Sequence, residues 1–232
     1  MKTILYIHGL GGGGDSRIPS ILAEHYGPRV RVVCRTYDFD PDVAAVFLEN
    51  LAAEVRPDLI IGESMGAPHA LRLRLKSSEG SQSRLQPSDE LSAANGTIPR
   101  LFVSPSLGAP LRIARWKFLA KIPGVRLLLN YIYRPRREGD RQRPDFRYEI
   151  LCKYRRHYCR AIENAAKMLP GTCFAFFGTK DHYRRSGIVS IRRWEKLFGK
   201  DSYAVYDGTH YMEEEYLHSM LIPRIDSLLS LA

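Results

Sequence analysis

The sequence has 232 residues, 44% of them hydrophobic, and a chain of this size can bury one sizeable core. We therefore expect a single domain over residues 1–232. Its four cysteines form no CxxC pair, so a zinc site, a thioredoxin-like motif and a disulfide framework have little support, and a reducing cytoplasm is the expected location. The net charge of +10 belongs to one segment, because residues 111–160 contain 15 Lys and Arg against four acidic residues.

Segments typical of strands and helices alternate along the chain. The expected strands cover residues 2–8, 31–37, 58–63, 100–104, 172–178 and 202–206. The expected helices cover residues 16–26, 41–55, 65–76, 150–168, 188–198 and 213–231. This alternation predicts an α/β fold of the doubly wound type, with a mainly parallel six-stranded sheet and helices on both of its faces.

Residues 107–160 interrupt this alternation after the fourth strand. They include the whole basic segment, and we interpret them as an insertion within the single domain. We expect the insertion to lie over the carboxyl edge of the sheet, where folds of this class place their ligands. Cys152 and Cys159, seven residues apart in an expected helix, are predicted to pack against its neighbours.

The first motif with chemical content is Gly62-Glu63-Ser64-Met65-Gly66, a G-x-S-x-G sequence. It stands where the third strand meets a helix, which is the context that the motif requires. The two glycines keep side chains out of a turn so tight that the serine adopts a strained backbone conformation. Ser64 is then presented at a helix start, where N–H groups and the helix dipole favour negative charge, and is the candidate nucleophile.

A serine hydroxyl becomes a good nucleophile only when a base removes its proton and an acid orients that base. Asp181 directly follows the fifth expected strand and His210 follows the sixth, in the chain order Ser, acid, His. All three then lie at one edge of the sheet, so we predict a triad of Ser64, Asp181 and His210. Asp207, three residues before His210, is the alternative acid.

Acyl transfer also needs donors for the oxyanion that forms on the carbonyl oxygen. The backbone N–H of Met65, which follows the nucleophile, and that of Leu10, after the first strand, are the candidate donors. Gly9 and Gly11 are candidate substrate-binding residues, because glycines allow the chain to approach a substrate closely.

These elements resemble the alpha/beta-hydrolase superfamily, especially its compact bacterial serine esterase-like members. The matching motifs span nearly the whole chain: His8-Gly9-Leu10-Gly11, Gly62-Glu63-Ser64-Met65-Gly66, Gly178-Thr179-Lys180-Asp181 and Gly208-Thr209-His210. The resemblance implies a strand order of 2-1-3-4-5-6, with the insertion acting as a lid. The chain departs from the family in starting at the strand before His8-Gly9, without the two strands that often precede it, and in the unusually basic lid.

Two other interpretations remain open. Residues Gly9–Gly14 also match the G-x-G-x-x-G pattern of a Rossmann dinucleotide-binding protein, but that interpretation leaves Ser64, Asp181 and His210 unexplained. A catalytically silent binding protein on the same fold would be expected to have lost one of these three residues.

The basic segment has several interpretations. A solvated lid surface is the plainest, and an anionic acyl substrate or an anionic membrane surface are alternatives. The adjacent Arg136 and Arg137 are candidate substrate-binding residues because guanidinium groups grip anions. We do not expect a nucleic-acid partner, a cofactor or a metal. The predicted function is thus cleavage of a small-molecule ester or thioester, with substrate identity and oligomeric state left open.

Overall fold

The computed structural model describes residues 1–74, 98–135 and 138–231. Its centre is a six-stranded parallel sheet formed by β1 (Lys2–Ile7), β2 (Val30–Cys34), β3 (Leu59–Glu63), β4 (Arg100–Val103), β5 (Cys173–Gly178) and β6 (Tyr203–Tyr206). The strand order is β2-β1-β3-β4-β5-β6, which confirms the predicted fold class and sheet order.

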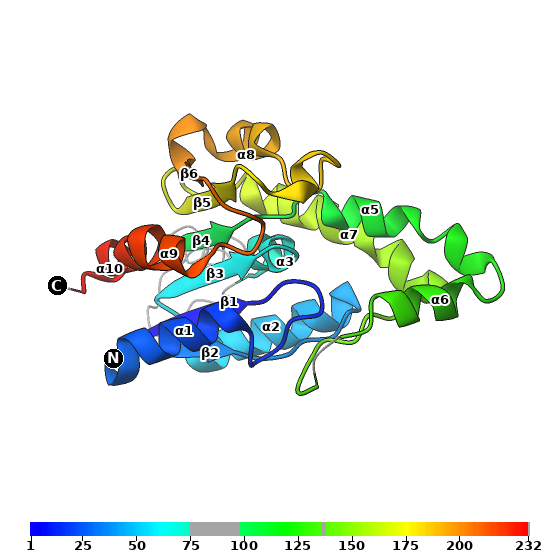
Figure 1. Cartoon of the computed structure of the whole chain (residues 1–232), viewed down its shortest axis with the longest axis horizontal. Helices are drawn as coiled ribbons and strands as arrows, with labels where there is room; N and C mark the ends of the chain where they lie inside the picture. Colours follow the sequence, from blue (N-terminus) through cyan, green and yellow to red (C-terminus); the bar gives the residue numbers. More distant parts are fainter. Residues whose placement is uncertain (75–97, 136–137, 232) are drawn as a thin grey trace, which may run out of the picture.

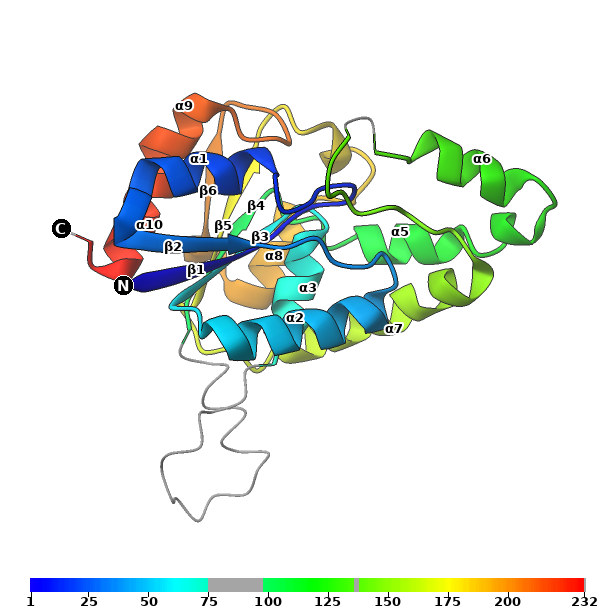
Figure 2. The same cartoon turned by 90° about the horizontal axis from the view of Figure 1, so that it is seen from below.

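Helices cover both faces of the sheet (Figures 1 and 2). One face carries α1 (Arg17–Tyr26) and α10 (Ile222–Leu229), and the other carries α2 (Pro41–Val55), α3 (Gly66–Arg72), α7 (Tyr148–Ala165) and α8 (Ile191–Phe198). Alternate residues of a strand point to opposite faces. In β1, Ile4 and Tyr6 therefore pack with α1 and α10, whereas Leu5 and Ile7 pack with α2 and α3.

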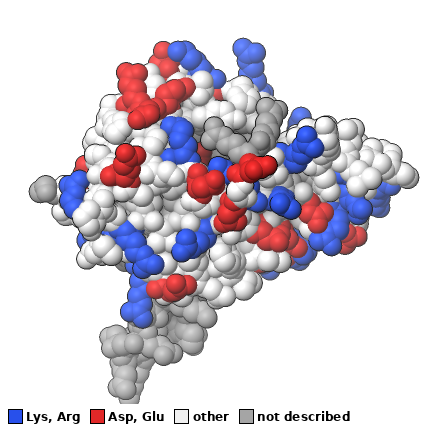
Figure 3. Space-filling view, turned by 60° about the horizontal axis from the view of Figure 1, so that its bottom comes forward, with Lys and Arg blue, Asp and Glu red and all other residues white. Residues whose placement is uncertain are grey.

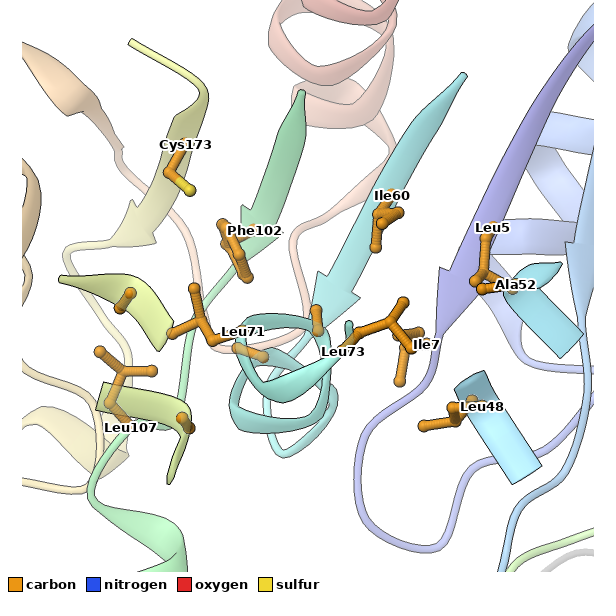
Figure 4. Packing of buried hydrophobic residues seen from close by; sticks show 14 of the residues in the cluster. Leu5, Ile7, Leu48, Ala52, Ile60, Leu71, Leu73, Phe102, Leu107 and Cys173 are labelled. Atoms are coloured by element: carbon orange, nitrogen blue, oxygen red, sulfur yellow. The ribbon is translucent and has the colours of Figure 1, made fainter. Parts of the chain in front are cut away.

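The core on the α2 and α3 face is made almost entirely of aliphatic and aromatic side chains. Figure 4 shows Leu5, Ile60 and Phe102 on neighbouring strands, with Leu48 and Leu71 on the helices that cover them. Ile60 and Phe102 have no exposed surface. This packing holds the strands in a fixed register, and that register decides where the carboxyl ends of the strands meet.

The helix starts agree with the sequence signals. Helix α2 begins at Pro41, as predicted, because proline is preorganised for the first helical turn and the Asp40 side chain accepts the Asp42 N–H at 3.0 Å. Helix α3 ends at Arg72, earlier than the predicted boundary at residue 76. The closing helix is interrupted between α9 (Glu214–Tyr216) and α10 by a π-helical turn, Leu217–Leu221, which the sequence did not reveal.

The predicted insertion contains α5 (Ala109–Arg115), a 3-10 turn at Leu119–Lys121, α6 (Val125–Ile132) and most of α7. Its parts differ in how firmly they join the body. Phe146, Leu151 and Tyr154 pack in a separate small core with Phe39 and Met65. Helix α6, in contrast, has no buried residue and lies at the end of the molecule opposite both termini (Figures 1 and 2).

Two further features of the insertion concern its surface. The prediction that Cys152 and Cys159 pack against neighbouring elements is wrong, because both lie on the exposed side of α7. The basic residues do not form an unbroken field: Figure 3 shows acidic side chains among the Lys and Arg side chains over this part of the molecule. Within the described ranges, no helix combines the length and apolar character needed to cross a bilayer.

Candidate active site

The G-x-S-x-G turn follows β3 and has the conformation that its sequence predicts. Ser64 has φ of 49°, in the left-handed region that a residue with a side chain rarely adopts. Its N–H donates to the Val103 carbonyl of the neighbouring strand at 2.9 Å, and its carbonyl accepts the Ala67 N–H at 3.1 Å. The strained residue is therefore held by β4 on one side and by the first turn of α3 on the other.

The glycine after Ser64 is required by the sheet. A Cβ atom on Gly66 would lie 2.0 Å from the Ile7 carbonyl oxygen and 2.7 Å from that of His8, both on the backbone of β1 and its extension. Only glycine lets α3 start this close to β1. Gly9 faces the turn from the other side, where an added Cβ would lie 3.1 Å from the Ser64 Cβ.

The three predicted triad residues lie together in one hydrogen-bonded series. His210 Nε2 lies 2.8 Å from Ser64 Oγ, and His210 Nδ1 lies 2.7 Å from Asp181 Oδ2. The three residues follow the carboxyl ends of β3, β5 and β6, which the parallel register places at one edge of the sheet. A neutral imidazole that donates from Nδ1 to the carboxylate leaves Nε2 free to accept the serine proton.

Asp181 is a buried carboxylate with a fixed orientation. Its side chain has no exposed surface, and Oδ1 accepts the Tyr183 N–H at 2.8 Å while Oδ2 faces His210. The Tyr183 ring meets the His210 ring edge-on with centroids 4.7 Å apart. Backbone and aromatic contacts therefore hold the acid and the base in place before any ligand arrives.

The alternative acid, Asp207, has a different environment. Its side chain is 70% exposed and forms an ion pair with Lys180 at 2.9 Å, and that contact lowers the pKa of the Asp207 carboxyl. Its Oδ1 accepts the Thr179 hydroxyl at 2.8 Å. With one oxygen on Lys180 and the other on Thr179, Asp207 joins the loops after β5 and β6 rather than orienting His210.

Two backbone N–H groups can serve the oxyanion. In the part of the chain that the structure describes, neither the Leu10 N–H nor the Met65 N–H has an acceptor. Met65 precedes α3, and Leu10 follows Gly9, which lies against Ser64. Both groups therefore border the nucleophile, as an oxyanion hole requires.

Gly11 belongs to a loop that the insertion holds from outside. Its N–H donates to the Gln142 Oε1 at 3.3 Å, and the Gln142 N–H donates to the Gly12 carbonyl at 2.8 Å. A Cβ on Gly13 would lie 1.8 Å from the Asp140 carbonyl oxygen. The glycine-rich loop thus packs against Asp140 and Gln142 of the insertion. This contact disfavours its interpretation as a dinucleotide-binding turn.

The remaining predicted residues, Arg136 and Arg137, lie outside the described residues. The sequence also failed to single out Ser106, whose Oγ lies 3.1 Å from Ser64 Oγ and whose N–H donates to the Ser64 carbonyl at 3.0 Å. Ser106 follows the carboxyl end of β4, so the argument that located Asp181 and His210 also applies to it. No sequence signal could have identified Gln142, because its role depends on a contact with Gly11, which is 131 residues away in the chain.

Two ionisable side chains, the half-buried Glu63 and the buried His8, adjoin the site. Burial raises the pKa of the Glu63 carboxyl, although Tyr6, which donates a hydrogen bond to it at 2.7 Å, and the nearby His210 act in the opposite direction. Burial also lowers the pKa of His8 to about 4, so its ring, stacked on Tyr37, is neutral at pH 7. Among the described residues, no group of three or more His, Cys, Asp and Glu side chains is placed to hold a metal ion.

Several solved structures share this architecture at low sequence identity. An epoxide hydrolase of the alpha/beta hydrolases superfamily, from metagenomes of hot environments, aligns with 100% of this chain and 91% of its own, at a TM-score of 0.50 and 10% identity. NosK from Streptomyces actuosus aligns with 100% of this chain and 98% of its own, at a TM-score of 0.52 and 15% identity. The chain has the alpha/beta-hydrolase fold.

A third structure with the alpha/beta-hydrolase architecture comes from work on the metagenome-derived lipolytic enzymes LipS and LipT. It aligns with 98% of this chain and 93% of its own, at a TM-score of 0.50 and 11% identity. No protein-family model and no curated protein matches the sequence. The likeness to solved structures therefore concerns the alpha/beta-hydrolase fold alone, and any function must be argued from the site.

Proposed function

We propose that the protein is a serine hydrolase that cleaves a carboxylic ester or thioester of a small acyl substrate. The observation that carries the proposal is the hydrogen-bonded series from Asp181 through His210 to Ser64. A catalytically silent protein would have no use for a strained serine whose hydroxyl lies 2.8 Å from a buried histidine. The lipolytic neighbours on the same fold are consistent with this chemistry.

The proposed reaction has two halves. In the first, His210 Nε2 takes the Ser64 proton as Oγ attacks the acyl carbonyl, and Asp181 stabilises the resulting imidazolium through Nδ1. The N–H groups of Leu10 and Met65 stabilise the negative charge on the carbonyl oxygen. His210 then gives its proton to the departing alcohol or thiol, which leaves the acyl group on Ser64.

The second half releases the acyl group. A water molecule takes the place of the leaving group, His210 Nε2 accepts one of its protons, and the hydroxide attacks the ester of Ser64. Collapse of this second tetrahedral intermediate returns the proton from His210 to Ser64 Oγ. The products are a carboxylic acid and the enzyme in its starting protonation state.

Covalent labelling tests this proposal directly. A fluorophosphonate probe reacts with activated serines, so we expect a single adduct on Ser64 after digestion and mass spectrometry. Ser64→Ala should abolish the label, and Ser106→Ala is the matched control because its hydroxyl lies 3.1 Å from that of Ser64. An unlabelled wild type, or an adduct on Ser106, would contradict the proposal.

We also propose that the protein works in a reducing compartment such as the cytoplasm. All four cysteines are free thiols, with Cys34 and Cys173 buried and Cys152 and Cys159 exposed. Exposed thiols persist where glutathione keeps them reduced. Counting free thiols with a maleimide reagent immediately after lysis of the native host checks this point. Failure of Cys152 and Cys159 to react with the maleimide would contradict it.

A further inference from the structure

The basic residues of the insertion divide into two groups. Several of them form ion pairs with acidic residues of the body: Arg141 with Asp15 at 3.0 Å, Arg156 with Asp42 at 2.5 Å, and Lys153 with Asp40. Arg112 and Arg115, on α5, have no carboxylate within ion-pair distance among the described residues. Helix α5 therefore carries positive charge that no carboxylate of the described residues balances.

Arg112 and Arg115 line a small pocket between the start of α5 and the segment that follows Asp181. Its other wall comes from Ser186, Gly187 and Arg193, after the loop that carries Asp181, and its volume is about 100 Å³. A water molecule needs roughly 10–15 Å³ of such space. The pocket therefore has room for a small group such as a tetrahedral oxyanion.

The two walls of the pocket meet closely at Gly108. The Gly108 N–H donates to the Ile188 carbonyl at 2.8 Å, and a Cβ on Gly108 would lie 2.5 Å from the Gly187 carbonyl oxygen and 2.8 Å from Arg193 Nη1. Gly108 stands two residues after Ser106, whose hydroxyl contacts Ser64. The start of the insertion and the segment after Asp181 are therefore in direct contact at Gly108.

Arg193 supplies the observation that points to a ligand. Its Nη1 atom is buried and has no hydrogen-bond acceptor among the described residues, and no carboxylate there forms an ion pair with its guanidinium. A buried donor atom without an acceptor is costly, and the half-buried Arg193 shares the pocket with the exposed Arg112 and Arg115, whose like charges repel its own. An anion in the pocket would relieve both penalties.

We propose that the pocket formed by Arg112, Arg115 and Arg193 binds an oxyanion of phosphate type. Guanidinium groups match phosphate and carboxylate geometry through paired N–H donors, and three of them offer more donors than one tetrahedral anion requires. The anion is either a group carried by the substrate of Ser64 or free phosphate. The binding itself does not depend on the proposed hydrolase activity.

Direct binding of inorganic phosphate tests the pocket. Calorimetric titration of the full chain, with sodium chloride holding the ionic strength constant, should give saturable one-to-one binding. The double variant Arg112→Gln/Arg115→Gln should bind at least about tenfold more weakly, because each charge-assisted hydrogen bond contributes about that factor or more. Arg193→Gln should weaken binding similarly.

A matched double variant controls for net charge. Arg126→Gln/Arg155→Gln removes the same charge from exposed positions on α6 and α7, away from the pocket, and should bind phosphate like the wild type. Absence of saturable binding, or equal weakening in both double variants, would overturn the proposal, because the effect would then be general electrostatic attraction.

A kinetic comparison distinguishes the two sources of the anion. If the substrate carries it, phosphate raises KM for an anionic ester but not for a neutral ester of equal acyl length, and Arg112→Gln/Arg115→Gln raises KM for the anionic ester alone. If free phosphate is the ligand, phosphate changes the kinetics of both esters alike. Failure to hydrolyse either ester would count against the hydrolase proposal and would leave the binding result standing.

Discussion

The carboxyl edge of the sheet and helix α6 of the insertion differ sharply in burial. At the edge, Asp181 and His210 are almost wholly buried, and backbone hydrogen bonds to β4 and α3 hold Ser64 in a strained conformation. On α6, Leu127 is 66% exposed and Tyr131 61% exposed. The contrast teaches that the residues of the candidate site are fixed by the sheet, whereas α6 of the insertion packs only loosely against the rest of the chain.

The largest expected effect follows from removing the nucleophile at the ordered edge. Ser64→Ala should lower kcat by about a million-fold where the wild type is efficient, because the covalent route is lost while the fold is kept. Hydrolysis of short p-nitrophenyl esters measures this loss, with circular dichroism as the check on folding. A variant that retains the wild-type rate would show that the reaction does not pass through Ser64.

The next effect separates the two carboxylates near His210. Asp181→Asn should lower kcat by up to about ten-thousand-fold, since the neutral amide cannot stabilise the imidazolium and favours the wrong tautomer. Asp207→Asn is the matched control and should leave kcat near the wild-type value, because Asp207 faces Lys180 and Thr179 instead. The opposite ranking would mean that the exposed carboxylate is the working acid.

A pair of truncations compares the packed sheet with α6 in free energy. Ile60→Ala should lower the free energy of unfolding by about 2–5 kcal/mol, because Ile60 has no exposed surface and the cavity cannot refill. Leu128→Ala, at a side chain that is 56% exposed, should change it by less than about 0.5 kcal/mol. Urea unfolding measures both. Comparable losses would show that α6 packs more firmly than its exposure indicates.

The smallest expected effect is at the contact between the two regions. Gln142→Ala removes the acceptor of the Gly11 N–H and the donor to the Tyr37 and Asp38 carbonyls, which loosens the loop that carries Leu10. We expect kcat/KM to fall by roughly tenfold, less than the hundred-fold or more typical of removing an oxyanion donor itself. The exposed neighbour Arg143→Ala should have no effect. Equal activity of both variants would show that Gln142 of the insertion does not support the loop that carries Leu10.

The sequence predicted the elements of the sheet well because their signals are local. Apolar runs ending in glycine mark β1 and β3, and Pro41 after Asp40 marks the start of α2. The boundaries that failed depend on distant contacts. Helix α3 ends at Arg72, where the Arg72 guanidinium donates to the Pro41 carbonyl at 2.9 Å and to Asp42 at 3.0 Å. No window of sequence around Arg72 contains those partners.

The candidate site shows the same division. The order of Ser64, Asp181 and His210 after three strands was enough to place them at one edge, because parallel strands share the direction in which they end. The sequence could not choose between Asp181 and Asp207 on this basis alone, since both follow strands. Burial and the ion pair to Lys180 made the distinction, and both arise from the packing of loops after β5 and β6.

The sequence by itself determined the alternation of strands and helices, the strained turn at Ser64 and the positions of the triad candidates, since each depends on residues adjacent in the chain. Tertiary structure alone decided which basic residues of the described ranges meet a carboxylate and which do not. Arg156 meets Asp42, 114 residues away, whereas Arg112 and Arg115 line the same pocket as Arg193. Charge counts along a sequence carry no distances, and electrostatic energy depends on distance and burial.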